Sequence, residues 1–214
     1  MGFPVYDFRT DVRNILVTPQ IRSRFLRMEP GQVSQGHTHD LGHEIFLILS
    51  GRCEFTIDGE SEVLGPGQMC VALVDQMHSV RVMGDEPMTM YLSVTPHIQP
   101  THTFWDKDGN KLPPRFSLHS AYDIAVDTSM TNDELLQQHV GAAQSVAATA
   151  QTFAQVQAEQ AAVYRQAIGS GDGAAATAAR AAMWEALSAL HSQLFSLDDN
   201  WNELAPRLTD GKPA

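Results

Sequence analysis

Short apolar segments separated by glycine-containing turns fill residues 15–98, and this pattern constrains the fold more than any other feature of the chain. Polar and apolar residues alternate from Ile21 to Met28, which is typical of a strand with one buried face. The continuous apolar run from Ile45 to Leu49 indicates a strand that is covered on both faces. Asp58-Gly59 is a strong hairpin turn signal. Roughly eight strands at this spacing predict an antiparallel sandwich or barrel.

The chain changes character after residue 98. Residues 99–130 are rich in proline and polar side chains, so we expect an irregular segment that wraps the barrel. Thr131 and Glu134 have the spacing of a capping box, and apolar residues then recur every three or four positions. Because glycines interrupt this pattern between Gly169 and Gly173, we predict an antiparallel helical hairpin at 131–206. A short helix around 199–204 is expected to close it, before a tail at 207–214.

The predicted domains are therefore a barrel with an N-terminal arm at 1–98, the wrapping segment, and the helical hairpin. Two isolated helices of this kind bury too little apolar surface to be stable alone. The hairpin must pack on the barrel or on another subunit, and we expect it to be the dimerisation element of a homodimer.

Charge and composition exclude several classes of partner. The net charge of −11, without a basic run, argues against nucleic acid or an anionic membrane surface. No stretch approaches the roughly 18 apolar residues of a membrane helix, and the N-terminus has no secretory signal pattern. The spacing of Cys53 and Cys70 resembles neither a zinc nor a redox motif. We expect a cytoplasmic protein whose partner is a small molecule.

Two histidines and a carboxylate indicate a metal site. His37 and His39 lie one residue apart, so on an extended segment their imidazoles point to the same side. Glu44 follows five residues later and can return to that side after a short turn or bulge. Two neutral imidazoles and one carboxylate suit a divalent first-row metal such as Fe, Mn, Ni, Cu or Zn.

The spacing of these residues also matches a known motif. The first segment has every signature position, namely Gly31, His37, His39, Glu44 and Gly51. A second segment has Gly67 and His78 at the expected separation. It departs from the usual proline, glycine and asparagine at Leu73, Asp75 and Val82. Together the two segments resemble the paired motifs of the cupin superfamily over residues 20–98. The resemblance implies a mainly β protein, with an antiparallel double-stranded β-helix (jelly-roll) barrel before the helical hairpin.

In cupins the matching residues hold one divalent metal inside the barrel. The resemblance therefore implies four metal ligands: His37, His39, Glu44 and His78. One or two coordination positions would remain for water, dioxygen or a chelating substrate. We favour Fe(II), with Mn, Ni, Zn or Cu as alternatives. The competing interpretation is a metal-free cupin whose histidines only form hydrogen bonds, although burying so many unpaired polar groups is costly.

Further residues are candidates for the substrate pocket. Apolar walls are expected from residues near the ligands on the same strands, namely Phe46, Ile48 and Val80. His97 and His102 lie at and beyond the end of the last strand. They either line the barrel mouth or are solvated loop residues.

Two residues are candidates for catalysis. Arg24 alternates with Arg22 onto one strand face, where a guanidinium can clamp a substrate carboxylate, or where a strand edge is simply solvated. Tyr91 is either a proton donor or base near a metal-bound substrate, or an ordinary core or interface residue. The remaining histidines are expected at the rim of the site (His43) or in structural or surface positions (His119, His139 and His191).

The predicted function is that of a metal-dependent enzyme acting on a small organic molecule. The absence of an obvious internal carboxylate besides Glu44 favours an oxygen-using dioxygenase. A metal-dependent lyase or isomerase of the same fold is the alternative enzyme. A non-catalytic cupin that binds or senses a small molecule is the alternative from another class, although the C-terminal helices lack a helix-turn-helix pattern.

Overall fold

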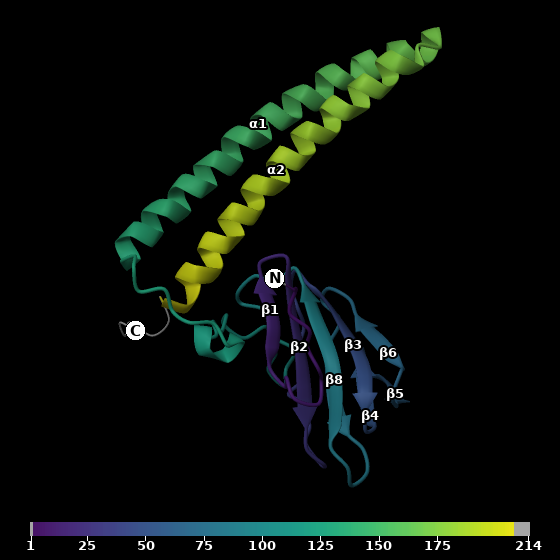
Figure 1. Ribbon diagram of the computed structural model, residues 1–214, viewed down its shortest axis with the longest axis vertical. Coiled ribbons are helices and arrows are strands. Elements are labelled where there is room, and N and C mark those ends of the chain that lie inside the picture. Colours follow the sequence, from purple (N-terminus) through teal and green to yellow (C-terminus); the bar gives the residue numbers. More distant parts are fainter. Residues whose placement is uncertain (1, 208–214) are drawn as a thin grey trace. The chain divides into compact units, whose positions relative to one another are not determined.

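The computed structural model describes residues 2–207, so the predicted tail lies outside the described residues from position 208 onward (Figure 1). The described residues form two compact units. Residues 2–127 and 205–207 belong to the strand unit, and Thr128–Leu204 forms the helical unit.

The strand unit contains two antiparallel sheets. The five-stranded sheet has the order β1 (Asn14–Thr18), β2 (Ile21–Met28), β8 (Met88–Thr95), β3 (His43–Ser50) and β6 (Met69–Ala72). The three-stranded sheet has the order β5 (Glu60–Leu64), β4 (Cys53–Ile57) and β7 (His78–Val82). The strand bounds follow the alternating segments of the sequence closely, so the predicted jelly-roll barrel is confirmed.

The pairing of the central strands is non-local. β8 lies between β2 and β3, with Val94 opposite both Arg22 and Glu44. This arrangement joins strands that are distant in the chain and places the inner faces of β2, β3 and β8 side by side. Hydrogen bonds from β8 to β2 and to β3 therefore fix which side chains of these three strands point to the inner face of the five-stranded sheet.

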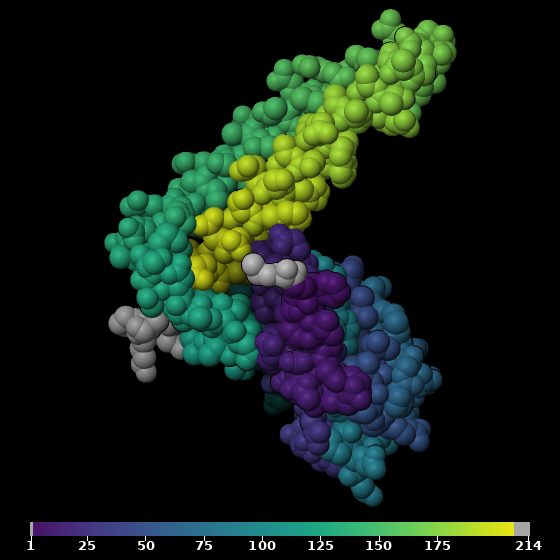
Figure 2. All heavy atoms as spheres, viewed as in Figure 1, coloured from purple at the N-terminus to yellow at the C-terminus, as the bar shows by residue number. Residues whose placement is uncertain are grey.

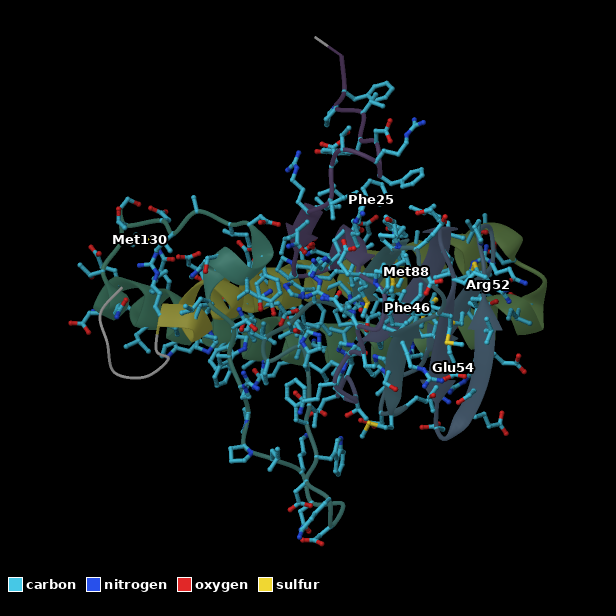
Figure 3. The ribbon with its side chains drawn as sticks, turned by 90° about the horizontal axis from the view of Figure 1, so that it is seen from below. Phe25, Phe46, Arg52, Glu54, Met88 and Met130 are labelled. Atoms are coloured by element: carbon cyan, nitrogen blue, oxygen red, sulfur yellow. The ribbon has the colours of Figure 1, made fainter. Side chains whose placement is uncertain are left out.

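The hydrophobic core lies between the two sheets. The rings of Phe46 on β3 and Phe55 on β4 have centroids 4.6 Å apart, across the space between the sheets. Phe46 and Met88 both belong to this core (Figure 3). Ile48 is completely buried within it. The fully buried residues hold the sheets together and leave one end of the space for the site described below.

Tight turns connect the strands. Asp58 and Gly59 both have positive φ, 50° and 86°, as a hairpin turn between β4 and β5 requires. Gly51 has φ 73°, and a Cβ there would lie 2.5 Å from the carbonyl oxygen of Pro87. The backbone at this motif position therefore accepts only glycine without strain.

The segment after β8 is largely irregular, as predicted. It contains a 3-10 helix at His119–Tyr122, and Thr103 forms an isolated bridge with Thr38. The Trp105 indole Nε1 donates to Thr38 Oγ1 at 3.1 Å, which attaches the segment to the barrel. The N-terminal arm covers part of the strand unit in the view of Figure 2, and Phe8 contacts Phe25 with ring centroids 6.4 Å apart. The first described residues of the arm project away from the sheet (Figure 3).

The helical unit is an antiparallel hairpin of α1 (Asn132–Ser170) and α2 (Gly173–Arg207). α1 begins with the predicted Thr131 capping box and ends at Gly171, whose φ is 76°. The ring of His139 lies 5.5 Å from that of Trp201, and Gln157 Nε2 donates to the carbonyl of Met183, which confirms the antiparallel register.

One helix prediction is wrong. Residues 199–204 are not a separate closing helix but the last turns of α2, because no glycine or proline interrupts the chain between Gly173 and Pro206. The two helices are 39 and 35 residues long, so the whole chain is mixed rather than purely β. None of the helices within residues 2–207 is both long and apolar enough to cross a bilayer.

Candidate metal centre

Backbone pairing places two of the four predicted ligands opposite each other. His37 and His78 form an antiparallel bridge, with N–H to carbonyl distances of 3.1 and 3.0 Å. His39 lies two residues beyond His37, so its side chain returns to the same side. Glu44 lies near the start of β3, after a turn in which Gly42 approaches the carbonyl oxygen of Pro96.

The four side chains converge on one point. Glu44 Oε2 lies 2.8 Å from His39 Nε2, 3.1 Å from His78 Nε2 and 3.9 Å from His37 Nε2. One potential ligand atom from each of the four residues lies within 4.8 Å of all the others. Glu44, His39 and His78 are buried, and the His37 side chain is only 13% exposed. The structure therefore brings together the complete set that the sequence motifs indicated.

The opposite side of each imidazole is held by a backbone carbonyl. Nδ1 of His37 donates to the carbonyl of Gln35 at 2.9 Å, and Nδ1 of His78 donates to that of Gln76 at 2.9 Å. Nδ1 of His39 donates to the carbonyl of Thr101. Because a carbonyl can only accept, these three bonds place the imidazole proton on Nδ1 and direct the Nε2 lone pairs toward the centre.

This arrangement requires a cation at the centre. Three Nε2 lone pairs and a carboxylate are all acceptors, so in neutral form they would repel one another at these distances. His37 Nε2 is buried and makes no hydrogen bond with any described residue. Either bound protons or a metal ion resolves the conflict, and three imidazoles with one carboxylate suit a divalent first-row metal. The residues present therefore fit the predicted metal.

The pKa shifts of Glu44 and His78 describe the metal-free site, in which a proton replaces the metal ion as the cation. Burial raises the pKa of Glu44, but the nearby His37 imidazole and the hydrogen bonds from His39 and His78 outweigh it and hold this pKa well below its usual value. Burial lowers the pKa of His78, but its bonds to Glu44 and to the Gln76 carbonyl outweigh burial and raise the pKa. Without metal, a proton on His78 thus stabilises the Glu44 carboxylate.

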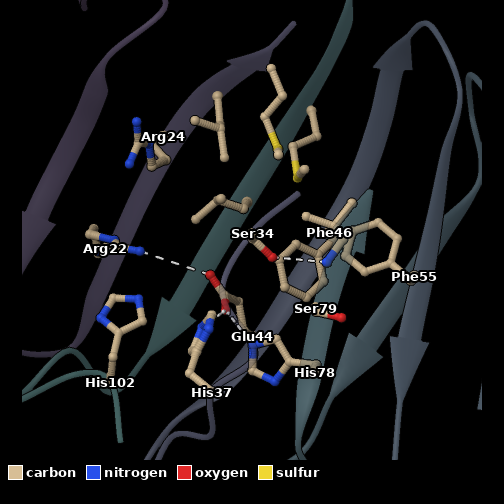
Figure 4. Close-up of a pocket in the computed structure, with 15 residues that line it drawn as sticks. Arg22, Arg24, Ser34, His37, Glu44, Phe46, Phe55, His78, Ser79 and His102 are labelled. Atoms are coloured by element: carbon tan, nitrogen blue, oxygen red, sulfur yellow. Dashed lines mark hydrogen bonds and ion pairs between the residues drawn. The ribbon is translucent and has the colours of Figure 1, made fainter. Parts of the chain in front are cut away.

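A pocket opens beside the four ligands, between the two sheets (Figure 4). Its empty space is about 490 Å³, part of it open to solvent. Arg22 and Arg24 lie along one wall, and Phe46 and Phe55 lie on the other side (Figure 4). The other apolar lining residues are Leu26, Met28, Val80, Met90 and Leu92. The site thus combines a polar centre with a mostly apolar chamber.

Three of the predicted pocket residues, Phe46, Val80 and His102, line this chamber, and so does the predicted catalytic residue Arg24. Desolvation by burial, followed by the charges of His37, His39 and Arg22, lowers the pKa of His102 to about 2. The solvated alternative for the two arginines is wrong, because β2 is an inner strand and the Arg22 side chain is 5% exposed. Burial, followed by the charge of Arg22, lowers the pKa of Arg24.

Three predicted residues lie elsewhere. Ile48 points to the same face as Phe46 but is packed within the core and does not line the pocket. His97 is buried against Tyr122, with ring centroids 4.7 Å apart, and burial followed by the charge of Arg22 lowers its pKa to about 3. Neither residue reaches the substrate chamber.

Tyr91 also lies away from the pocket. Its neighbours on β8, Met90 and Leu92, face the chamber, so Tyr91 faces the opposite side of the sheet. There its hydroxyl pairs with Ser23 Oγ at 2.9 Å, and its ring contacts Phe25 at 6.0 Å. The expected proton transfer by Tyr91 has no geometric basis, and the residue has a packing role.

The other histidines do not join the cluster. His43 is exposed, and its Nδ1 accepts the backbone N–H of Val74 at 3.0 Å. His119 is buried in the 3-10 helix, His139 contacts Trp201, and His191 contacts Phe195.

The sequence interpretation missed several contributors to the site. The carbonyls of Gln35 and Gln76 each lie two residues before the histidine that they hold, which is a local pattern that could have been recognised. The carbonyl of Thr101 is 62 residues from His39, and no sequence signal indicates it. Arg22 Nη2 lies 3.8 Å from Glu44 Oε1, a contact that depends on the pairing of β2 and β3 with β8.

Comparison with known proteins relates part of the chain to one family. The family model described as "Cupin domain" matches residues 24–95. The polyketide synthase CurC of Streptomyces cyaneus is 32% identical over 91 residues, which cover 40% of this chain and 59% of that protein. The chain thus spans less than two thirds of that relative's length.

Solved structures with similarity to the strand unit include two bacterial proteins. A double-stranded β-helix domain protein of Klebsiella pneumoniae has 23% identity and a TM-score of 0.42, covering 44% of this chain and 91% of that chain. KdgF from Halomonas sp. has 22% identity and a TM-score of 0.38, covering 40% of this chain and 76% of that chain.

Proposed function

Because residues 24–95 form a cupin domain with a candidate metal site, we propose that this protein is a metal-dependent enzyme acting on a small organic substrate. One observation carries the proposal. Three imidazoles, each held at Nδ1 by a backbone carbonyl, direct Nε2 toward the same carboxylate oxygen beside a pocket. Such preorganisation of ligands by their outer contacts is characteristic of metal sites.

For the reaction we propose dioxygenation, with Fe(II) as the metal. Fe(II) in this site would supply neighbouring positions for a chelating substrate and for dioxygen. The apolar walls formed by Phe46, Phe55 and Leu92 would exclude water from the reacting groups. Mn, Ni, Zn and Cu remain alternatives, since the same donor set accepts each of them.

The lining of the pocket supports an oxygen reaction. Among the described lining residues, Glu44 is the one carboxylate, and no lysine or tyrosine is present. A lyase or isomerase needs a side chain that moves a proton. A dioxygenase places both atoms of dioxygen in its product and takes the electrons from its substrate, so it needs neither a separate reductant nor such a side chain.

The similarity to a polyketide synthase supports a class of substrate. Polyketides carry carbonyl groups on alternate carbons and cyclise to phenols, and both arrangements place two oxygens where one metal can chelate them. We therefore propose a β-dicarbonyl or a hydroxylated aromatic compound as the substrate. The apolar part of such a molecule matches the apolar lining of the chamber.

Oxygen uptake tests the reaction. The purified protein is stripped of metal, reconstituted anaerobically with Fe(II), and mixed with catechols, hydroxybenzoates and β-diketones in an oxygen electrode. We expect uptake with at least one compound, with loss of uptake in His37→Ala and retention in His43→Ala. His43 is the matched control because it neighbours Glu44 but lies outside the ligand cluster. Full iron loading without uptake on any compound would contradict dioxygenation.

The lyase or isomerase alternative has one specific observation in its favour. His102 lines the pocket, contacts His37 with ring centroids 4.6 Å apart, and is the remaining imidazole among the described lining residues; because burial lowers its pKa to about 2, it is neutral and could act only as a proton acceptor. His102→Gln separates the reactions: a lyase or isomerase relying on it would lose most of its turnover, whereas the proposed dioxygenase would retain it. A protein that binds these compounds without converting them would be the binding or sensing cupin instead.

A further inference from the structure

Two arginines occupy the pocket wall next to the candidate metal centre. Arg22 and Arg24 lie two positions apart on β2, so both side chains point from the inner face of the sheet into the chamber (Figure 4). β2 is hydrogen-bonded on both sides, to β1 and β8, which fixes the positions of both residues. The proposed reaction assigns no task to either guanidinium.

The hydrogen-bonding capacity of these arginines is largely unused. Nε of Arg22 and Nε of Arg24 are both buried without a hydrogen-bond partner in the described part of the chain. Arg22 forms an ion pair with Glu44 Oε1 at 3.8 Å, which is too long for a hydrogen bond. Arg24 makes neither an ion pair nor a hydrogen bond with any residue that the structure describes. One buried and one partly buried cation, each with a buried free Nε donor, are therefore directed at the same space.

The charges of the lining are unbalanced. Even with neutral histidines, the described lining residues carry two guanidinium groups and one carboxylate, so at least one positive charge remains, and a bound metal ion or a protonated imidazole adds to it. Asp123 is the other nearby acid, but its Oδ2 accepts the backbone N–H and the side-chain amide of Asn14. Burying an uncompensated cation is costly, and a protein retains one where a bound anion balances it.

We propose that Arg22 and Arg24 form an anion clamp, and that the substrate carries a carboxylate on an apolar body next to its metal-chelating oxygen. This inference rests on the proposed function, because it places the carboxylate beside the metal ligands of the same site. A carboxylate offsets this excess positive charge and matches the planar fork of a guanidinium. The apolar side chains that line the pocket, such as Leu26, Met90 and Leu92, accommodate the body of the molecule.

Arg24 is the residue to change. Arg22 contacts Glu44, so its substitution would also disturb the ligand cluster, whereas Arg24 has no such contact. Arg27 provides the matched control, because it lies on the same strand with a side chain 51% exposed and pairs with Glu29 at the surface. Arg24→Met and Arg27→Met thus make the same chemical change inside and outside the pocket.

Calorimetric titration with 2-hydroxybenzoate and its neutral analogue 2-hydroxybenzamide tests the clamp. Both probes present the same ring and hydroxyl group, and only the first is an anion at pH 7. We expect the wild-type protein to prefer the anion by about tenfold or more, since hydrogen bonds to charged groups are stronger than neutral ones. Arg24→Met should lose most of this preference without weakening amide binding, and Arg27→Met should keep it. Arg24→Lys should be intermediate, because it retains a charge but not the fork.

Titrations of metal-free and zinc-loaded protein separate this inference from the proposed function. A preference for the anion in the metal-free protein, lost in Arg24→Met, supports the clamp even where the iron-loaded protein consumes no oxygen. Equal affinity for both probes, retention of the preference in a folded Arg24→Met variant, or no binding of the benzoate at all would overturn the clamp. Circular dichroism and the Tm of each variant establish that it is folded.

Discussion

Replacing Glu44 with glutamine perturbs the ligand cluster sharply, because it keeps the shape of the side chain and removes its charge. In the metal-free protein Glu44 accepts hydrogen bonds from His39 and His78, and Arg22 Nη2 lies 3.8 Å from its other oxygen. Removing one partner of a buried charge pair costs about 3–5 kcal/mol. We expect Glu44→Gln to lower the free energy of unfolding by about this amount at pH 6.

The loss should depend on pH through His78, whose pKa in the folded protein is raised above 6.5. A group with a raised pKa contributes its full stability below pH 6.5 and loses that contribution as the pH rises through its folded-state pKa. A hydrogen bond to a charged group is worth about 1.5–3 kcal/mol and a neutral one about 0.5–1.5 kcal/mol. The cost of Glu44→Gln should therefore fall by about 1–2 kcal/mol between pH 6 and pH 9.

Urea denaturation followed by circular dichroism, in the presence of EDTA, measures both values. Glu54→Gln is the matched control, because Glu54 pairs with Arg81 at the surface at 2.7 Å. Loss of this surface ion pair should lower the free energy of unfolding by no more than about 1 kcal/mol, and this cost should be the same at both pH values. The lowered pKa of the buried His97 contributes equally to the stability of wild type and variants, so it cancels when their free energies of unfolding are subtracted. A cost for Glu44→Gln that is constant from pH 6 to pH 9, or larger at pH 9, would refute the reasoning.

Three further predictions concern two residues outside the centre and the oligomeric state. Ile48→Ala should lower the free energy of unfolding by about 2–5 kcal/mol in urea denaturation, because Ile48 is fully buried between the sheets; a cost below about 1 kcal/mol would argue against that packing. Tyr91→Phe should cost about 1 kcal/mol, for the lost bond to Ser23, and leave metal content unchanged, whereas metal loss would return Tyr91 to the site. The homodimer stays a prediction: light scattering after size-exclusion chromatography should give about twice the chain mass of 23.5 kDa, and a monomer would disprove it.

Local sequence patterns were sufficient to locate most strands and the start of α1, and to identify the four candidate ligands. Alternation and glycine turns depend on neighbouring residues, so β2, β4 and the capping box at Thr131 could be located without knowledge of the pairing. The His37 and His39 pair is likewise local. His78 came from its motif spacing to Gly67, and the structure brings it opposite His37.

Strand pairing decided what the sequence could not show. Tyr91 and Leu92 are neighbours that can both pack in a core, and only the register of β8 against β2 and β3 turns Leu92 inward, opposite Arg24 and Phe46. His97 and His102 follow the same strand, yet the path of the irregular segment places only His102 in the pocket. Such placements depend on contacts between distant residues, which no local pattern records.

Metal content tests the central claim most directly. Wild type, the double variant His37→Ala with His39→Ala, and His43→Ala are purified side by side from metal-supplemented cultures and measured by inductively coupled plasma mass spectrometry. The convergence of four ligand atoms within 4.8 Å predicts about one divalent metal ion per chain in wild type and His43→Ala, and almost none in the double variant. Unchanged metal content in the double variant, or a wild-type protein that binds no metal, would contradict the assignment of this centre.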